Sequence, residues 1–363
     1  MTWQKISISR FGGPEVLDLT EESTVPVPGP GEVRIKVLAA GTGYTDVFIR
    51  RGRYPDYKGP LPFVPGYDLV GVVDEVGPGV GSPGEGQMVA DLSVVGGYTQ
   101  YAIRPAGFLV PVPDGLDPAE AVCIPLAYLT AFQLLTRHRR LATGATVLVI
   151  GASGTVGTAL LDLARHFGLA AVGTSSPANL AVVEGFGAKA IDYGAGDFVE
   201  AVRKVTADAT GNNRAGVDVV LDAIGGAHFT RSFACLAPGG LLVGYGSQAM
   251  ADGREGLLSA GLGLARLKFW DMFNFLFSGR SAQWYSITAQ RKKHPEQFKA
   301  DMATLFNLLH DRAINPVVID RLPLAAAREV HSRIEAGGLG GKIVLTPWTT
   351  TAAPASPAPA QPY

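Results

Sequence analysis

The chain has 363 residues, with 31 Lys and Arg against 32 Asp and Glu, and a formal net charge of −1 at neutral pH. This balance argues against a nucleic-acid-binding protein, which usually carries a basic excess on one face. Hydrophobic residues make up 47% of the chain, which excludes global disorder. The length suits two domains of roughly 100–200 residues each.

The cysteines and the apolar stretches indicate the compartment. Only Cys123 and Cys235 are present, far apart in the chain, which excludes a disulfide framework and a four-thiolate zinc site. The amino-terminal residues lack the apolar core of a signal peptide. The most hydrophobic stretch, residues 257–277, is interrupted by three charged side chains, which argues against a spanning helix. The sequence therefore predicts a cytoplasmic protein with no transmembrane span.

Residues 1–122 are predicted to form a compact, β-rich domain. Residues 32–39 alternate polar and apolar side chains, as a half-buried strand does. A second strand is expected at 69–76, followed by a dense cluster of Gly and Pro that marks turns. Two further strands are expected at 89–92 and 98–103.

The pattern changes near residue 118. Residues 118–137 have helical apolar spacing, with Asp117 as N-cap and Pro118 at the first helical position, and predict one helix. Apolar strands then alternate with helices, which predicts a doubly wound parallel sheet covered on both faces. The strands are expected at 146–150, 170–173, 190–191, 217–223 and 240–244, and the helices at 158–167, 178–186, 198–207 and 227–235.

The carboxyl-terminal part of the chain departs from this alternation. Residues 250–287 are apolar and aromatic and contain Gly. Helices at 295–312 and 324–335 follow, with strands at 317–319 and 342–345. The last residues, 348–363, are mostly Ala, Pro, Ser and Thr, a composition typical of disorder.

The strand at 146–150 leads into a glycine-rich turn and then a helix. Free N–H groups and the helix dipole stabilise a pyrophosphate at a helix N-terminus, and glycine lets the backbone approach it closely. An ordinary tight turn between strand and helix is the alternative. The context favours a dinucleotide-binding loop. Its residues are Gly151, Ala152, Ser153, Gly154, Thr155, Val156 and Gly157.

The end of the second strand indicates which dinucleotide binds. An NAD site usually places Asp or Glu about 20 residues after the glycine loop, where it accepts from the ribose 2′-OH. Residues 173–179 hold no carboxylate, whereas Ser175, Ser176 and Asn179 can donate hydrogen bonds to a 2′-phosphate. The same side chains could instead cap the next helix. The predicted cofactor is NADPH.

Several ordered segments between residues 10 and 347 share a pattern with one family. They are Gly41–Asp46, Arg50–Pro55, Pro65–Gly71, Tyr128–Ala131, the glycine loop, Gly185–Ala188, Ile191–Tyr193 and Gly341–Leu345. With them the chain resembles the medium-chain dehydrogenase/reductase superfamily, in its zinc-independent quinone oxidoreductase branch. The apolar segment after Gly246 is similar to the vesicle amine transport protein-like subgroup.

This resemblance implies a fold and a domain organisation. It implies an α/β protein with a GroES-like β-rich catalytic domain from residues 1–122 and 289–347. A Rossmann NADPH-binding domain from residues 123–288, carrying the apolar insertion 250–287, would complete it. The active site would lie between the two domains.

The resemblance also bears on metal and reaction. Zinc-dependent relatives place a Cys in the first motif and Gly-His-Glu in the second, where this chain has Gly43 and Gly66-Tyr67-Asp68. With neither thiolate nor imidazole at these places, we expect no zinc. Without a zinc alkoxide, alcohol oxidation is disfavoured. Reduction of a quinone or an α,β-unsaturated carbonyl by NADPH is expected instead.

Further cofactor contacts are implied by the matching motifs. Thr130 and Tyr245 would lie at the nicotinamide pocket, and Ser175 and Tyr193 near the 2′-phosphate and adenine. Asn179 replaces a lysine that is common there. Other implied cofactor-binding residues are Asp222, Gly244, Gly246 and Lys342.

The substrate side of the motifs differs from that of the bacterial quinone reductases. Gly43 and Phe48 stand where those enzymes commonly have Asn and Tyr. Tyr54 matches the tyrosine with which related enoyl-thioester reductases place or protonate the substrate, and it is the expected catalytic residue, since a phenol can donate to a developing enolate. It could instead be a turn residue. Tyr44 could contact the nicotinamide end.

Three questions stay open from the sequence. The acceptor is expected to be lipophilic, and an enoyl-thioester reductase of fatty-acid or polyketide type is an alternative. A second alternative is a non-catalytic, nucleotide-binding structural or lipid-associated protein. Residues 257–285 could be a lid over the substrate or the surface of a homodimer, since exposed apolar patches usually mark interfaces.

Overall fold

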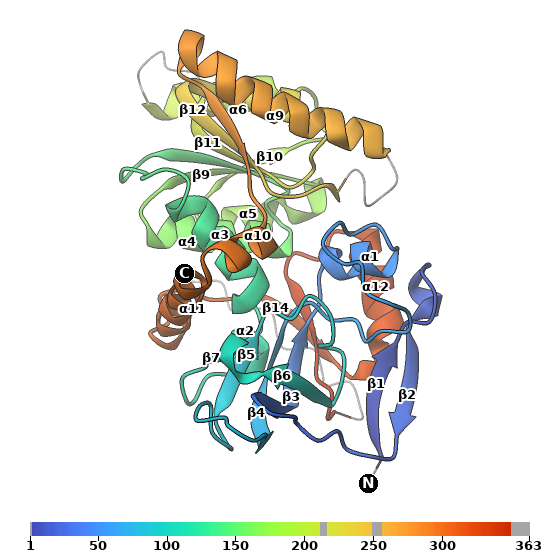
Figure 1. Cartoon of the computed structure of the whole chain (residues 1–363). Helices are drawn as coiled ribbons and strands as arrows, with labels where there is room; N and C mark the ends of the chain where they lie inside the picture. Colours follow the sequence, from blue (N-terminus) through green and yellow to red (C-terminus); the bar gives the residue numbers. More distant parts are fainter. Residues whose placement is uncertain (1, 211–215, 249–255, 350–363) are drawn as a thin grey trace. The chain divides into compact units, whose positions relative to one another are not determined.

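The computed structural model describes residues 2–210, 216–248 and 256–349 (Figure 1). It divides into two compact units, residues 1–129 with 294–363 and residues 130–293. The sequence placed these boundaries at 122 and 288. Most of the predicted disordered tail lies outside the described residues. Its first residue, Trp348, is held in the first unit, because its indole N–H donates to the Val37 carbonyl at 2.8 Å.

The first unit is built on a seven-stranded sheet and a separate antiparallel pair. The sheet has the order β14-β15-β3-β4-β5-β7, with β6 paired to β3. All of its pairings are antiparallel except β14 with β15. Its strands are β3 (Glu32–Gly41), β4 (Leu69–Val76), β5 (Met88–Asp91), β6 (Tyr101–Pro105), β7 (Val110–Pro111), β14 (Val318–Leu322) and β15 (Lys342–Leu345). The pair is β1 (Trp3–Ser7) with β2 (Asp18–Glu22), which the sequence did not predict.

The alternation seen in the sequence produces the core of this sheet. In β3, Val33, Ile35 and Val37 are fully buried, whereas Lys36 between them is exposed. They pack in one cluster with Leu69 and Val73 of β4. The helices of this unit are α1 (Tyr44–Arg50), α2 (Pro118–Ala121), α11 (Pro295–His310) and α12 (Ala327–Ala336).

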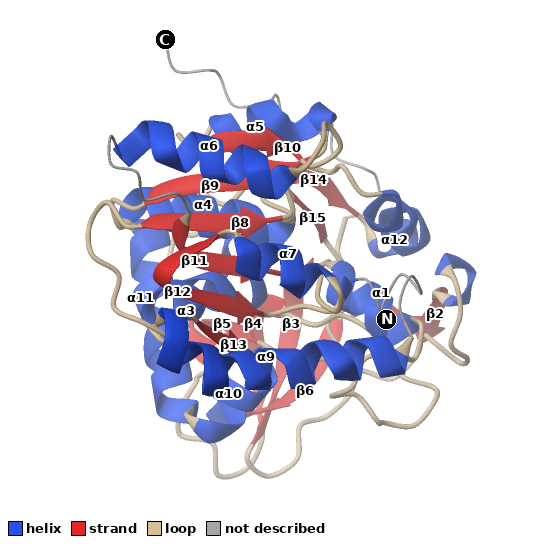
Figure 2. Ribbon diagram, turned by 90° about the horizontal axis from the view of Figure 1, so that it is seen from above, coloured by secondary structure: helices blue, strands red, loops and turns tan. Residues whose placement is uncertain are grey.

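The second unit confirms the predicted doubly wound sheet. Its six strands have the order β10-β9-β8-β11-β12-β13 and pair in parallel throughout (Figure 2). The strands are β8 (Thr146–Ile150), β9 (Ala170–Ser175), β10 (Lys189–Asp192), β11 (Val217–Asp222), β12 (Leu236–Gly244) and β13 (Ser281–Trp284). The chain begins at the centre with β8 and winds outward on both sides, which brings the carboxyl ends of β8 and β11 together at the switch in direction.

Helices cover both faces of this sheet. Leu148, Val172 and Val220 face one cluster with side chains of α6 (Phe198–Thr210), α7 (His228–Ala234) and α9 (Leu257–Ser278). The helices α4 (Thr155–His166) and α5 (Leu180–Glu184), with α3 (Leu129–Thr136) and α10 (Ile287–Lys293), complete the unit.

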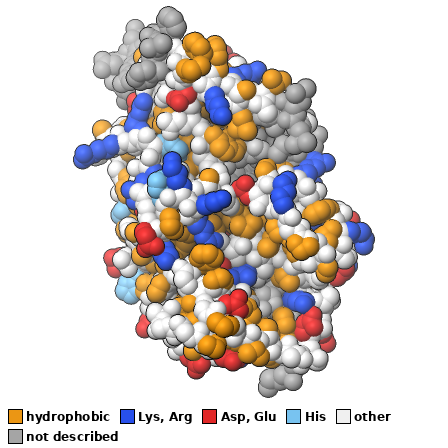
Figure 3. Space-filling model, in the orientation of Figure 1, with side chains coloured by type: hydrophobic (Ala, Val, Ile, Leu, Met, Phe, Trp, Pro, Cys, Tyr) orange, Lys and Arg blue, Asp and Glu red, His pale blue; other side chains and the backbone are white. Residues whose placement is uncertain are grey.

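Figure 3 shows positive and negative side chains scattered among hydrophobic ones on the face drawn, as the balanced composition suggests.

The single helix predicted at 118–137 is wrong in detail. The run consists of α2, a π-helical turn at Ile124–Tyr128, and α3. Pro125 has no N–H to donate and crowds the preceding turn, and the Tyr128 N–H reaches back five residues to the Cys123 carbonyl at 3.1 Å. Pro118–Thr136 is also the one described helical run that is long and apolar enough to cross a membrane. Since 83% of that window is buried, it has the character of a core helix.

The apolar segment is only partly an insertion. Residues 249–255 lie outside the described part, but Ser281–Trp284 forms β13, the sixth strand of the sheet. Between them α9 has two faces. On one, Leu267 is buried and Trp270 stacks on Phe233 with ring centroids 4.3 Å apart. The other exposes Leu262, Phe269, Met272 and Phe273. Whether this face serves as a lid or as a dimer surface stays a prediction.

Candidate cofactor and catalytic sites

The glycine loop between β8 and α4 is shaped for close backbone approach. Gly151 turns the chain with a φ of 74°, a conformation that favours glycine. A Cβ on Gly157 would lie 2.4 Å from the Gly151 carbonyl oxygen and 2.6 Å from that of Ala152. The N-cap, Gly154, offers no side-chain cap to the twelve-residue helix α4. The first N–H groups of α4 are therefore left to an external acceptor such as a phosphate.

The predicted 2′-phosphate side chains come together beside this loop. The Ser175 hydroxyl, at the end of β9, donates to the Ser153 hydroxyl at 2.9 Å. The Asn179 amide approaches the same oxygen at 3.4 Å. Ser175 and Asn179 are buried, and Ser176 is half-buried. The structure thus joins the glycine loop to the end of the second strand through hydroxyl and amide groups.

Tyr193 and its neighbour Asp192 complete this edge. Tyr193 is 56% exposed and its N–H donates to the Ser175 carbonyl at 3.3 Å, so its ring is available for an aromatic ligand. Asp192 pairs in register with Ser175, a carboxylate the sequence reasoning did not place here. Its Oδ1 accepts from the Gly194 N–H at 2.7 Å, which ties it to its own turn.

Asp222 ends β11 and is occupied within the second unit. One carboxylate oxygen accepts from the N–H groups of Ile224 and Gly225 at 2.7 and 3.2 Å. The other accepts from His228 Nδ1 at 2.8 Å and Ser232 Oγ at 2.7 Å. Burial alone would raise the pKa of Asp222, but the His228 and Ser232 hydrogen bonds hold it below its usual value. The carboxylate therefore fixes the strand-end loop, and a direct cofactor contact stays a prediction.

The loops after β11 and β12 touch backbone to backbone. A Cβ on Gly246 would lie 2.3 Å from the Ala223 carbonyl oxygen, and one on Gly244 would lie 2.6 Å from the Phe229 ring. Tyr245 follows β12, half-buried, and its N–H donates to the Asp222 carbonyl at 2.9 Å. Glycine at 244 and 246 is thus required by packing, whatever they contact in a bound cofactor.

Thr130 and Lys342 are two further residues predicted to contact the cofactor, and that contact stays a prediction for both. Thr130 is buried near the start of α3 in the second unit. Lys342 begins β15 in the first unit, where its ammonium donates to Asp68 Oδ2 at 3.0 Å and to the Val122 carbonyl at 3.3 Å. Despite burial, the Asp68 carboxylate raises the pKa of Lys342. A Cβ on Gly41 would lie only 2.0 Å from Asp68 Oδ1 and would therefore collide with this ion pair. The pair therefore has a structural role.

The catalytic candidate Tyr54 meets a second tyrosine. Its hydroxyl lies 2.7 Å from the hydroxyl of Tyr67, and the two rings meet edge to face with centroids 5.8 Å apart. The ring of Phe48 contacts Tyr54 at the same centroid distance. Burial raises the pKa of Tyr54 to about 12, although the Tyr67 hydrogen bond opposes the rise. The phenol is therefore protonated at neutral pH and can act as an acid.

Asp46 organises the backbone around this pair. Its Oδ2 accepts from the Gly43 N–H at 2.9 Å, which caps α1, and its Oδ1 accepts from the Tyr67 N–H at 2.9 Å. Burial, with the nearby Asp68 charge, raises the pKa of Asp46 to about 8. Sequence reasoning missed both the Asp46 bridge and the Tyr54–Tyr67 pair. One feature of the sequence could have indicated the pair: Tyr67 stands where the zinc-dependent relatives have the His of their Gly-His-Glu motif.

Tyr44 carries an unsatisfied polar group. Its hydroxyl is buried and has no hydrogen-bond partner among the described residues. Buried hydroxyls normally have a partner, so this one is ready for an external acceptor. The role of Tyr44 at the substrate or nicotinamide pocket stays a prediction.

The side chains that could bind a metal do not converge. Within residues 2–210, 216–248 and 256–349, no group of three or more His, Cys, Asp or Glu side chains is placed to hold an ion. At the positions of the zinc ligands, Asp68 is paired with Lys342 and Tyr67 with Tyr54. Burial raises the pKa of the Cys123 thiol to about 12, which disfavours the thiolate that zinc requires.

Comparison with known proteins identifies the family. An alcohol dehydrogenase GroES-like domain model matches residues 29–114, and a zinc-binding dehydrogenase model matches residues 186–345. The quinone oxidoreductase of Mus musculus is 32% identical over 345 residues, covering 94% of this chain and 96% of that one. The chain belongs to the quinone oxidoreductase family of the medium-chain dehydrogenases/reductases. The recognition made from the motifs is confirmed.

Two further relatives extend the comparison. The 2-haloacrylate reductase of a Burkholderia species is 32% identical over 347 residues, covering 94% of this chain and 98% of that one. A mycobacterial protein solved in complex with NADPH has a TM-score of 0.78 and 30% identity, covering 95% of this chain and all of that one. With the family models, these relatives support the predicted GroES-like and Rossmann fold class.

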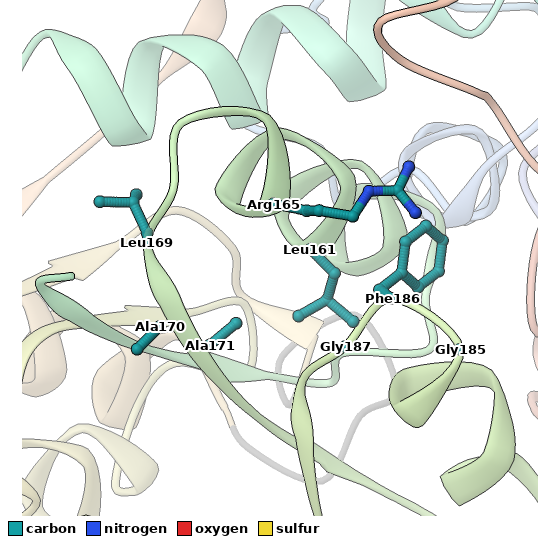
Figure 4. Close-up of a pocket in the computed structure, with 8 residues that line it drawn as sticks. All are labelled: Leu161, Arg165, Leu169, Ala170, Ala171, Gly185, Phe186 and Gly187. Carbon is teal, nitrogen blue, oxygen red and sulfur yellow. The ribbon is translucent and has the colours of Figure 1, made fainter. Parts of the chain in front are cut away.

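A pocket of about 300 Å³ lies at the other end of β9. Figure 4 shows the Arg165 guanidinium beside the Phe186 ring, with Leu161 next to them. Ala170 at its wall begins β9, whereas Ser175 at the glycine loop ends it. The pocket is therefore separate from the family cofactor site.

Proposed function

We propose that this protein is a zinc-free reductase that transfers a hydride from NADPH to a quinone or an α,β-unsaturated carbonyl. The observation that carries the proposal is the glycine loop: a Cβ at Gly157 would fill the space against two carbonyl oxygens, and α4 offers uncapped N–H groups beside Ser175 and Asn179. The complex of the mycobacterial relative with NADPH supports the cofactor.

The residues of the second unit fit this cofactor. The α4 N-terminus would hold the pyrophosphate, and Ser153, Ser175 and Asn179 would donate to the 2′-phosphate, since hydroxyl and amide donors suit an anion. Tyr193 would stack on the adenine. NADPH supplies the hydride, and the protein's part is to orient the two reactants and exclude water.

The absence of zinc is part of the proposal. Its basis is the donor set, because the two side chains at the motif positions are already paired with Lys342 and Tyr54. A reaction without a Lewis acid needs an acceptor that is already electron-poor, such as a quinone or an enone. The names of the quinone oxidoreductase and 2-haloacrylate reductase relatives agree with that class.

Tyr54 supplies the proton in this proposal. Reduction of an enone consumes one hydride and one proton, and the carbonyl oxygen becomes basic as the hydride arrives. A phenol with a raised pKa donates a hydrogen bond there without placing a charge in the site beforehand. We expect a lipophilic acceptor and a homodimer.

The test is a panel of quinones, enones and enoyl thioesters assayed with NADPH and with NADH. The proposal predicts turnover with quinones or enones and a preference for NADPH. Turnover confined to enoyl thioesters would favour the fatty-acid or polyketide alternative. Tight NADPH binding without any acceptor-dependent oxidation would favour a non-catalytic protein. Metal analysis of the same preparation should return no stoichiometric zinc.

A further inference from the structure

The Tyr54–Tyr67 pair can donate a proton outward from Tyr54. Tyr67 is fully buried, and its hydroxyl has Tyr54 as its hydrogen-bond partner at 2.7 Å. Tyr54 is half-buried, and either hydroxyl of the pair can be the donor between them. Each hydroxyl has a single proton to donate. When Tyr54 donates its proton to a substrate oxygen, the Tyr67 hydroxyl must therefore be the donor to Tyr54.

The pair is also held rigidly. The Tyr67 N–H is fixed by Asp46 at 2.9 Å, and the same carboxylate caps α1 through Gly43. The Tyr54 ring is held edge to face by Tyr67 and Phe48. The donor hydroxyl is thus placed before any substrate arrives, and preorganised donors stabilise charge without a reorganisation cost.

We propose that Tyr67 is a positioning residue that stabilises the phenolate left when Tyr54 gives up its proton. The inference rests on the proposed function. As the hydride bonds to the β-carbon, the C=C electron pair shifts and the carbonyl oxygen takes the Tyr54 proton. The O–H bond of Tyr54 breaks, and its electron pair stays on Tyr54, where it accepts the Tyr67 hydrogen bond. Water then returns the proton to Tyr54.

A double-mutant cycle tests the proposal in the full-length protein with NADPH and an enone. Tyr67→Phe removes only the hydroxyl, and we expect kcat to fall about 10-fold because a hydrogen bond to a charged group is lost. In a Tyr54→Phe background the same change should alter kcat less than about 2-fold, since coupled residues are non-additive. KM for NADPH should not move.

Tyr57→Phe is the matched control. Tyr57 lies in the same loop, and its hydroxyl donates to the Pro60 carbonyl at 3.2 Å, so its removal should leave kcat unchanged. NMR of protein labelled at the tyrosine ring carbon that bears the hydroxyl gives a second readout. Tyr67→Phe should shift the Tyr54 resonance, which is assigned with Tyr54→Phe, whereas Tyr57→Phe should not.

Each other result overturns the proposal. Equal losses in both backgrounds would show that Tyr67 acts through general structure, and the unfolding free energy of each variant would confirm it. An unchanged kcat or an unshifted Tyr54 resonance would show that the hydrogen bond is unimportant. If the wild-type protein oxidises NADPH with none of the acceptors tested, the proposed function is overturned as well. If the wild type is active and the effects of the two substitutions on kcat are additive, only the role of Tyr67 is overturned.

Discussion

The glycine loop of the second unit and the tyrosine pair of the first unit are built in opposite ways. Around Gly157 the backbone makes the site, and side chains matter because they are absent: a Cβ would lie 2.4 Å from a carbonyl oxygen. Around Tyr54 the side chains make the site. The Tyr54 hydroxyl lies 2.7 Å from the Tyr67 hydroxyl, and the Asp46 carboxylate accepts from the Tyr67 N–H. Position 157 leaves no room for a side chain, whereas the second region depends on its hydroxyl and carboxylate groups.

This difference separates binding from chemistry. A backbone-built loop offers fixed N–H dipoles to any phosphate and makes no distinction among acceptors. A side-chain site sets proton donors and their pKa values and can select a reaction. Changes in the first region should therefore affect NADPH binding, and changes in the second should affect turnover.

The largest expected effect is on stability, in the ion pair behind the tyrosine site. Asp68→Ala leaves the Lys342 ammonium buried without its partner and should lower the free energy of unfolding by about 3–5 kcal/mol. Denaturant unfolding measures it. Replacing both residues, as in Asp68→Ala with Lys342→Met, should recover part of the loss. If the single variant were as stable as the wild type, the pair would have no structural role.

The next largest effect concerns the glycine loop. Gly157→Val should weaken NADPH binding by about 100-fold or more, because the helix must move away from the strand to admit the side chain. Fluorescence titration with NADPH is the measurement. Gly261→Ala is the control, since a Cβ there meets nothing within 4 Å. Unchanged binding in Gly157→Val would remove the loop from the cofactor site.

Tyr54→Phe should mainly affect turnover. The loss of a general acid should lower kcat about 100-fold, with NADPH binding unaltered because the loop is untouched. Since burial raises the pKa of Tyr54 to about 12, the phenol keeps its proton as the pH rises, and wild-type kcat should show no alkaline loss from this group up to about pH 10. If Tyr54→Phe kept the kcat of the wild type, water and not Tyr54 would be the proton donor.

The smallest effect is on cofactor choice. Ser175→Asp places a carboxylate beside Ser153 and Asn179 and should lower the NADPH-to-NADH preference in kcat/KM about 10-fold through charge repulsion. Ser176→Asp, on a half-buried neighbour, shows whether the effect depends on position. An unchanged preference in Ser175→Asp would mean that the 2′-phosphate binds elsewhere.

The sequence predicted the backbone-built region much better than the side-chain-built one. Gly151–Gly157 is contiguous, and its strand and helix neighbours are local, so the glycine spacing together with that local context indicated it. Tyr54 and Tyr67 meet only because β3 and β4 fold back on each other around α1, a tertiary arrangement that periodicity does not encode. The family resemblance singled out Tyr54 but not its partner.

Two elements of the fold differ from the prediction, each for its own physical reason. The helix at 118–137 has the right apolar spacing, but Pro125 and tertiary packing convert its middle into a π-helical turn. The strand at Ser281–Trp284 was hidden in an apolar stretch because a short buried strand and a buried helix have similar composition.

A single-turnover experiment tests the central claim most directly. The purified protein is loaded with NADPH, and the unbound NADPH is removed. An enone or quinone is then added while the absorbance of the reduced nicotinamide is followed. We predict retention of NADPH by the wild type, rapid oxidation on addition of the acceptor, and loss of retention in Gly157→Val. A protein that retains no NADPH, or retains it without oxidation by any acceptor, would contradict the account.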